Sequence, residues 1–143
     1  MTNNTYKSLI KTLDLSVIQP LKVEYERKTE IFPTDKNINV HWTMKFPEQP
    51  QEIIDDKLLQ FYPMFEVELS SNEKNFYLHR TIIGISFEIK DFDKFDKIWN
   101  DKDIQEFFRN KQVFKLVWPF FRQQVCDGMS RVGLPPVTLP LVN

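Results

Sequence analysis

Residues 76–99 read FYLHRTIIGISFEIKDFDKFDKIW, and the hydrophobic period of this stretch changes once along its length. Up to residue 89 the apolar side chains alternate with polar ones such as Arg80 and Glu88, which is the period of a strand. From Phe92 onward they recur every three to four residues, which is the period of a helix. The stretch therefore predicts a long strand followed directly by helix. The residues predicted to share one strand face are Tyr77, Thr81, Ile83, Ile85, Phe87 and Ile89.

Upstream of this strand, three more segments alternate in the same way. Residues 14–26 read as one extended segment in which Pro20 places a break or a sheet edge. Residues 38–46 are the cleanest strand, and residues 65–69 alternate again. Polar turns join these segments, a pattern typical of an antiparallel sheet with one wet face. Residues 6–13 are compatible with one or two amphipathic helical turns or with an entering strand.

Downstream, the sequence predicts helices only. Ile104, Phe107 and Phe108 follow Asp101 or Asp103 as an N-cap, and a longer helix is expected over about 113–131. Pro119 is tolerable there only in the first turn. Gly133 and the prolines after it end the helix. With strands first and helices last, the fold class is α+β, in one domain over residues 1–143.

Composition excludes several functions. The net charge of −1 is spread along the chain, which argues against a nucleic-acid surface. No apolar run is long enough for membrane insertion, and no signal peptide is recognisable. The single cysteine leaves the cytoplasm as the expected location. Thirteen Phe residues in a chain of 143 carry more apolar surface than one small core is expected to bury. We therefore expect an oligomer interface or an apolar groove to bury part of it.

Residues for catalysis or metal binding do not stand out. His41 and His79 lie in separate strands without ligand spacing, and Cys126 lies in the long helix as a small hydrophobe. The alternating acids and lysines of DFDKFDK (91–97) indicate a solvated helix face. We therefore expect no enzyme activity, no metal and no cofactor. The aromatic and Met stripes at 42–46 and 61–65 indicate either core packing or an adaptable surface for extended peptides.

The segment WPFFRQQVCDGMSRVGLPPVTLPLVN (118–143) resembles the SecB family of export chaperones. It has the aromatic-Pro-aromatic step around Pro119, then Arg122, a Ser-Arg pair before Gly133, and an apolar, proline-bearing arm that closes near Pro-Val-Asn. DLSVIQP (14–20) and GISFEI (84–89) look like the first and fourth strands of that family.

The resemblance implies a four-stranded antiparallel sheet followed by a long helix, assembled as a dimer of dimers with the helices between the sheets. It implies a holdase that binds non-native polypeptides without ATP, with the arm packed along the assembled particle. The oligomer interface it implies consists of Val117, Phe120, Phe121, Val125 and Met129. The expected peptide-binding residues are Phe32, Trp42, Met44, Phe46, Phe61, Tyr62, Met64 and Phe65.

Two departures from the family bear on partners. This sequence stops at Asn143, where the family continues with a second helix and a charged tail, so we expect a more open groove. At the positions that dock the motor SecA, Asp14 and Leu78 match as possible docking residues, but acids are replaced by Ile18 and Arg80. Because this inverts the local charge, SecA docking is not carried over.

Two questions about function stay open on sequence. A dedicated client, such as the antitoxin of a toxin–antitoxin system, is favoured over general protein export, because the docking features are lost. The alternative from another class is a small-ligand-binding or structural α+β domain, in which the aromatic stripe lines an apolar pocket. A monomer that leaves the aggregation of an unfolded protein unchanged would favour this alternative.

Overall fold

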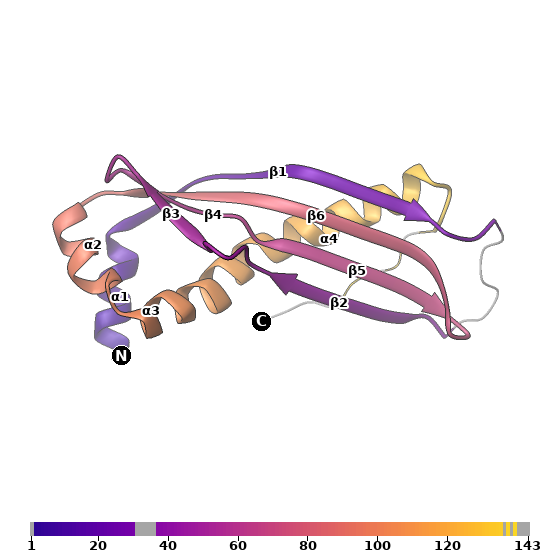
Figure 1. The fold of residues 1–143 in the computed structure, drawn as a ribbon, viewed down its shortest axis with the longest axis horizontal. Coiled ribbons are helices and arrows are strands. Elements are labelled where there is room, and N and C mark those ends of the chain that lie inside the picture. The colour runs from indigo at the N-terminus through magenta and orange to yellow at the C-terminus, as the bar shows by residue number, and fades with distance from the viewer. Residues whose placement is uncertain (1, 31–36, 136, 138, 140–143) are drawn as a thin grey trace.

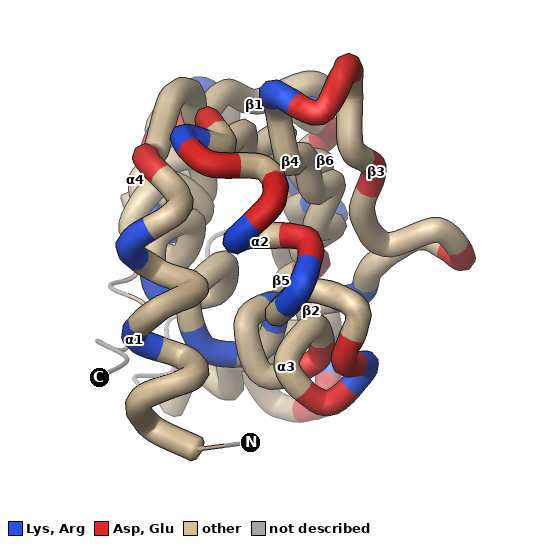
Figure 2. The backbone as a smooth tube through the Cα atoms, turned by 90° about the vertical axis from the view of Figure 1, so that its left-hand side faces the viewer, with Lys and Arg blue, Asp and Glu red and all other residues tan. Residues whose placement is uncertain are grey.

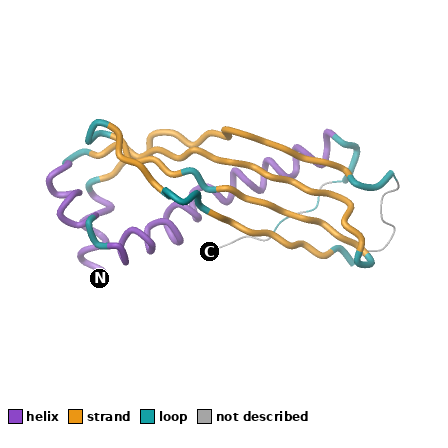
Figure 3. The backbone as a smooth tube through the Cα atoms, in the orientation of Figure 1, coloured by secondary structure: helices purple, strands orange, loops and turns teal. Residues whose placement is uncertain are grey.

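A computed structural model describes residues 2–30, 37–135, 137 and 139, and it confirms the α+β class. One antiparallel sheet faces a layer of helices, and the long helix α4 (Phe114–Arg131) runs diagonally behind the sheet (Figure 1). Figure 3 shows the shorter helices gathered at one end of the sheet. The strands are β1 (Leu13–Arg27), β2 (Asn39–Lys45), β3 (Gln51–Ile54), β4 (Leu58–Phe61), β5 (Met64–Ser71) and β6 (Lys74–Ile89).

The strand β6 is the centre of the sheet. It pairs with β1 along one side, and with β5 and then β4 along the other. The strands β2 and β3 flank β5 and β4, so the sheet has six strands instead of the expected four. The additional pair is the β3–β4 hairpin, whose turn places Asp55 and Asp56 at φ of 52° and 55°.

The helices start where the sequence supplies caps. Asp91 accepts a hydrogen bond from the Lys94 amide, and Asp101 accepts one from the Asp103 amide, so Asp101 is the N-cap of the two candidates. Most of the segment 6–13, left open between helix and strand, belongs to a helix that ends at Lys11, and its last residue, Leu13, begins β1. The bounds are α1 (Asn3–Lys11), α2 (Phe92–Trp99), α3 (Lys102–Phe107), a π-helix η1 (Phe108–Val113) and α4.

The two ends of α4 differ in how well they match the prediction. Gly133 has φ of 76°, and the Leu134 amide bonds the Met129 carbonyl at 2.9 Å, which confirms the expected stop. Pro119, however, lies inside the helix and not in its first turn, because helix continues from α3 through η1 into α4. The carbonyl that Pro119 leaves unpaired belongs to the exposed Lys115, where water can satisfy it.

The core lies between α4 and the inner face of the sheet. The predicted face of β6 is buried from Tyr77 to Ile89. Four residues expected at an oligomer interface also lie in this core of the single chain, because the helix stripe that carries them packs on its own sheet: Val117, Phe121, Val125 and Met129. The fifth, Phe120, is 45% exposed.

A polar ladder crosses this core. The Tyr77 hydroxyl bonds His79 Nδ1 at 2.9 Å, and His79 Nε2 bonds the Thr81 hydroxyl at 2.7 Å, with all three residues buried. Gly128 of α4 lies directly above the ladder, since a Cβ there would be 2.2 Å from the Tyr77 oxygen. Burial lowers the pKa of His79 to about 4, so the imidazole is neutral near pH 7.

Candidate peptide-binding site

An aromatic cluster joins the strand β2 to α4. Trp42 stacks on Phe114 with ring centroids 5.6 Å apart, and its centroid lies 4.6 Å from that of Trp118. Phe65 of β5 stacks on Phe121 at 4.6 Å. Trp42 and Phe114 are only half-buried, so the cluster reaches the surface at its β2 side. We call this set of five residues the Trp42 cluster.

The strand β2 is an edge of the sheet. Within the described residues its only strand neighbour is β5, with register from Asn39 opposite Ser70 to Lys45 opposite Met64. Trp42 and Met44 lie on the side of β2 that faces the helices, and Phe46 follows directly after the strand; all three are half-buried and pack against the core. An unpaired strand edge beside half-buried apolar side chains can accept an extended peptide as a further strand.

A charged group accompanies the cluster. Arg122 lies one turn after Trp118 on the same side of α4, and its Nε is buried without a hydrogen-bond partner in the described structure. A buried unpaired donor is costly to the folded state. Arg122 Nε therefore lacks an acceptor among the described residues.

Of the remaining predicted peptide contacts, Phe65 belongs to the buried part of the Trp42 cluster, and the others lie elsewhere or outside the described residues. Phe61 and Phe65 are fully buried, so they are core side chains and present no surface. Met64 is exposed, but it lies in a hollow on the opposite face of the sheet. The Tyr62 hydroxyl donates to Glu52 and Gln60, and the hydrogen bond to Glu52, then burial, raise the pKa of Tyr62 to about 12. Phe32 lies outside the described residues.

Sequence reasoning missed Phe114 and Trp118 as members of the site. Both belong to the segment FKLVWPFF, where Trp118 was noted only for the aromatic-Pro-aromatic step. Their four-residue spacing was the available signal, because residues i and i+4 lie on one side of a helix.

The strand β1 forms the other long edge and is unusually apolar at its surface. Leu15 is 47% exposed and Leu21 50%, while Val17 and Tyr25 are also exposed. In the described structure β1 pairs only with β6. A hollow of about 320 Å³ separates Val23 and Tyr25 from Gln124 and other residues of α4. The exposed Phe120 lies one turn before Gln124 on the same side of that helix.

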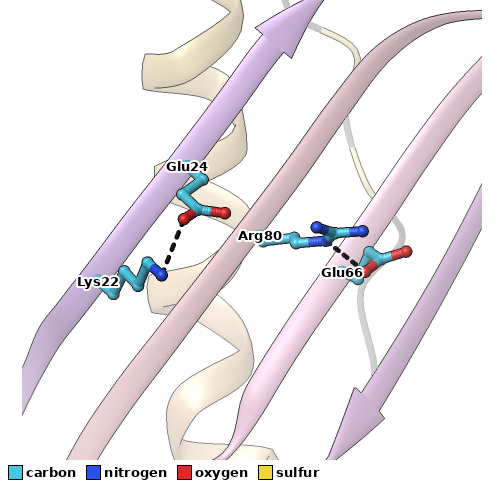
Figure 4. A network of polar contacts seen from close by, with 4 residues as sticks. All are labelled: Lys22, Glu24, Glu66 and Arg80. Carbon is cyan, nitrogen blue, oxygen red and sulfur yellow. Dashed lines mark hydrogen bonds and ion pairs between the residues drawn. The ribbon is translucent and has the colours of Figure 1, made fainter.

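The outer face of the sheet carries paired charges. Lys22 bonds Glu24 at 2.9 Å and Arg80 bonds Glu66 at 2.7 Å, across three neighbouring strands (Figure 4). The proposed docking residues lie on this face: Asp14 pairs with Lys90 at 3.3 Å, and Leu78 lines a hollow beside Arg80.

Ile18 instead packs against the core, because an irregularity in the β1–β6 pairing between Leu15 and Val17 shifts the strand by one residue. Thus only part of the position set attributed to SecA docking shares the outer face.

No protein-family model and no curated protein sequence matches this chain. Among solved structures, the chain is similar to the Rv1957 SecB-like chaperone of Mycobacterium tuberculosis, solved in complex with a ChAD peptide from the Rv1956 HigA1 antitoxin. The TM-score is 0.73 at 11% sequence identity, and the alignment covers 97% of each chain. The chain therefore has a SecB-like fold, as its sequence resemblance implied.

None of the helices among the described residues is long and apolar enough to cross a bilayer. No three His, Cys, Asp or Glu side chains in the described part converge as metal ligands would.

Proposed function

We propose that this protein is a chaperone that holds extended apolar segments of non-native polypeptides, without ATP and without covalent chemistry. The observation that carries the proposal is the β2 edge, which no described strand pairs on its outer side, with the half-buried Trp42 and Met44 beside it. The SecB-like fold supports it independently.

Binding would combine two contributions. Backbone hydrogen bonds to the β2 edge do not depend on client sequence, because every residue except proline carries the same donor and acceptor. Client side chains on the helix side would bury apolar area against Trp42, Met44 and Phe46, at roughly 25 cal/mol per Å². The cluster rings contact one another instead of enclosing a cavity, which favours a peptide over a small ligand.

For the client, we propose a dedicated partner protein such as an antitoxin. The structural neighbour was solved with an antitoxin peptide, and the outer sheet face here lacks the uniform negative charge expected for docking SecA. General export remains the alternative. Co-purification from the native host separates them: one dominant bound polypeptide supports a dedicated client, and a broad mixture of secreted precursors contradicts it.

We further propose that the protein self-associates through β1 and Phe120. Apolar side chains exposed along an unpaired edge are costly in a monomer and suit an interface between copies. We propose this surface as the oligomer interface in place of the α4 residues expected from the sequence, most of which are buried in the core. A dimer of dimers is the assembly that the SecB-like fold favours.

The test of chaperone activity compares Trp42→Gln and Phe46→Gln with the control Met64→Gln in suppressing aggregation of a chemically unfolded protein, followed by light scattering. We expect both site variants to lose most suppression while the control, on the opposite face, keeps it. Equal suppression by all three folded variants would contradict the placement of the site, and no suppression by the native protein would contradict the function.

A further inference from the structure

A further hollow lies at the end of the molecule where α1 meets α3 and η1. Its volume is about 430 Å³. The residues that line it come from α1, α3, η1 and α4: Tyr6, Phe107, Asn110, Lys111, Gln112, Phe114 and Lys115. This lining differs from the Trp42 cluster, because it combines aromatic rings with lysine side chains.

The apolar walls are aromatic rings from three elements. Tyr6 and Phe107 meet edge to face, with centroids 4.9 Å apart, and this contact fixes α1 against α3. Phe114 closes another side, and the same ring stacks on Trp42. Phe114 thus belongs both to the lining of the hollow and to the Trp42 cluster.

The polar groups of the hollow are cationic or neutral. Lys111 and Lys115 lie four residues apart on one continuous helical run, and Asn110 and Gln112 add carboxamides. None of the described residues that line the hollow is acidic. The neighbouring α1 carries Lys7 and Lys11 as its only charged side chains, as its blue segments show (Figure 2). Burial raises the pKa of Tyr6, so its hydroxyl remains a neutral donor.

The π-helix η1 supplies three of the lining residues, Asn110, Lys111 and Gln112. A π-turn is less stable than an α-turn and is found mostly at functional sites. The wider π-turn brings three consecutive residues to the hollow. In an α-helix, consecutive residues would point in more widely separated directions around the helix axis.

We propose that this hollow binds an acidic side chain of the client, adjacent to the apolar segment held by the Trp42 cluster. The inference rests on the proposed function and deepens it by naming the client chemistry as an apolar segment flanked by Asp or Glu. Lys111 and Lys115, both exposed, pair with the carboxylate, while Tyr6, Phe107 and Phe114 provide the apolar wall beside it. The shared Phe114 sets the carboxylate close to the apolar contacts.

The experiment uses two fluorescent peptides with the same apolar segment, one flanked by Asp and the other by the isosteric Asn. Binding to the full-length protein is followed by anisotropy at low salt. We expect the Asp peptide to bind about tenfold more tightly than the Asn peptide, since two partly exposed ion pairs contribute roughly 0.5–1 kcal/mol each. High salt should remove most of this difference.

The variant Lys111→Glu/Lys115→Glu should abolish the preference for Asp and leave the affinity for the Asn peptide within about twofold. The matched control, Lys74→Glu/Lys97→Glu, makes the same change in net charge at exposed lysines outside the hollow. The inference is overturned if the native protein binds both peptides equally, or if the control loses the preference as fully as the site variant. Failure of the native protein to bind even the Asn peptide would overturn the proposed function itself.

Discussion

At the scale of single residues, Gly128 shows how closely α4 approaches the sheet. Any Cβ at this position would overlap the Tyr77 hydroxyl, which the His79 ring holds in place. We predict that Gly128→Ala lowers the free energy of unfolding in urea by about 2 kcal/mol, through overpacking. In the Tyr77→Phe background the same change should cost less, because the overlapping oxygen is absent. An equal cost in both backgrounds would show that the contact does not limit packing.

His79 gives the protein a dependence on pH with a definite sign. Its pKa is about 4 in the folded chain and near 6.5 in the unfolded chain, so the unfolded chain binds the extra proton between these values. Stability contributed by neutral His79 is complete above pH 6.5 and is lost as the pH falls toward 4, by about 3 kcal/mol in total. Urea titrations of the native protein and His79→Gln should show this extra slope only in the native protein. Parallel pH profiles would contradict the assignment.

The residue scale also shows why the sequence could not separate groove from core. Trp42 and Phe65 both belong to Met-and-aromatic stripes, yet Phe65 is buried and Trp42 reaches the edge. The difference arises from sheet order, because β5 is an inner strand and β2 is outermost. Alternation along one strand contains no information about which strand lies next to it.

At the scale of elements, periodicity predicted β1, β2, β5, β6 and the helices from α2 onward, while the β3–β4 hairpin was missed. Its strands are four residues each, and its turn uses Asp55 and Asp56 where Gly or Asn would have been the usual signal. The π-helix was missed too, since its six residues continue the helical pattern around them. These two elements add the fifth and sixth strands and the hollow beside α1.

One arginine joins two distant elements. Arg27 at the end of β1 donates through Nη1 to the Val132 carbonyl at 3.0 Å, and through Nε and Nη2 to the carbonyls of Thr29 and Glu30. We predict that Arg27→Gln lowers the free energy of unfolding by about 1–3 kcal/mol, with faster amide exchange near Val132. Arg27→Lys should recover only part of this, because an ammonium cannot match the planar fork. Full recovery by lysine would show that charge alone matters.

At the scale of the whole molecule, we predict an oligomer whose subunits contact one another through β1. Substituting Leu15→Asp/Tyr25→Asp buries charge at that surface and should convert the particle to a monomer in multi-angle light scattering. The control Ile53→Asp/Ile54→Asp places the same charge on two exposed residues of β3 and should leave the mass unchanged. A native protein that is monomeric, or an oligomer that survives the double substitution, would contradict the proposed interface.

We propose that these two edges of the sheet have separate roles: β1 for copies of the chain and β2 for clients. The exposed apolar residues of β1 and the half-buried ones of β2 fit this division. This division also gives a role to the apolar side chains that the core of this Phe-rich chain does not cover.

The most direct test of the central claim is hydrogen–deuterium exchange of the native protein with and without a chemically unfolded polypeptide. We predict that the added polypeptide slows amide exchange in β2, over Asn39–Lys45, because the client backbone pairs with that edge. Exchange in the β3–β4 hairpin should stay unchanged. Protection confined to other elements, with β2 exchanging as before, would contradict the claim that clients bind at the β2 edge.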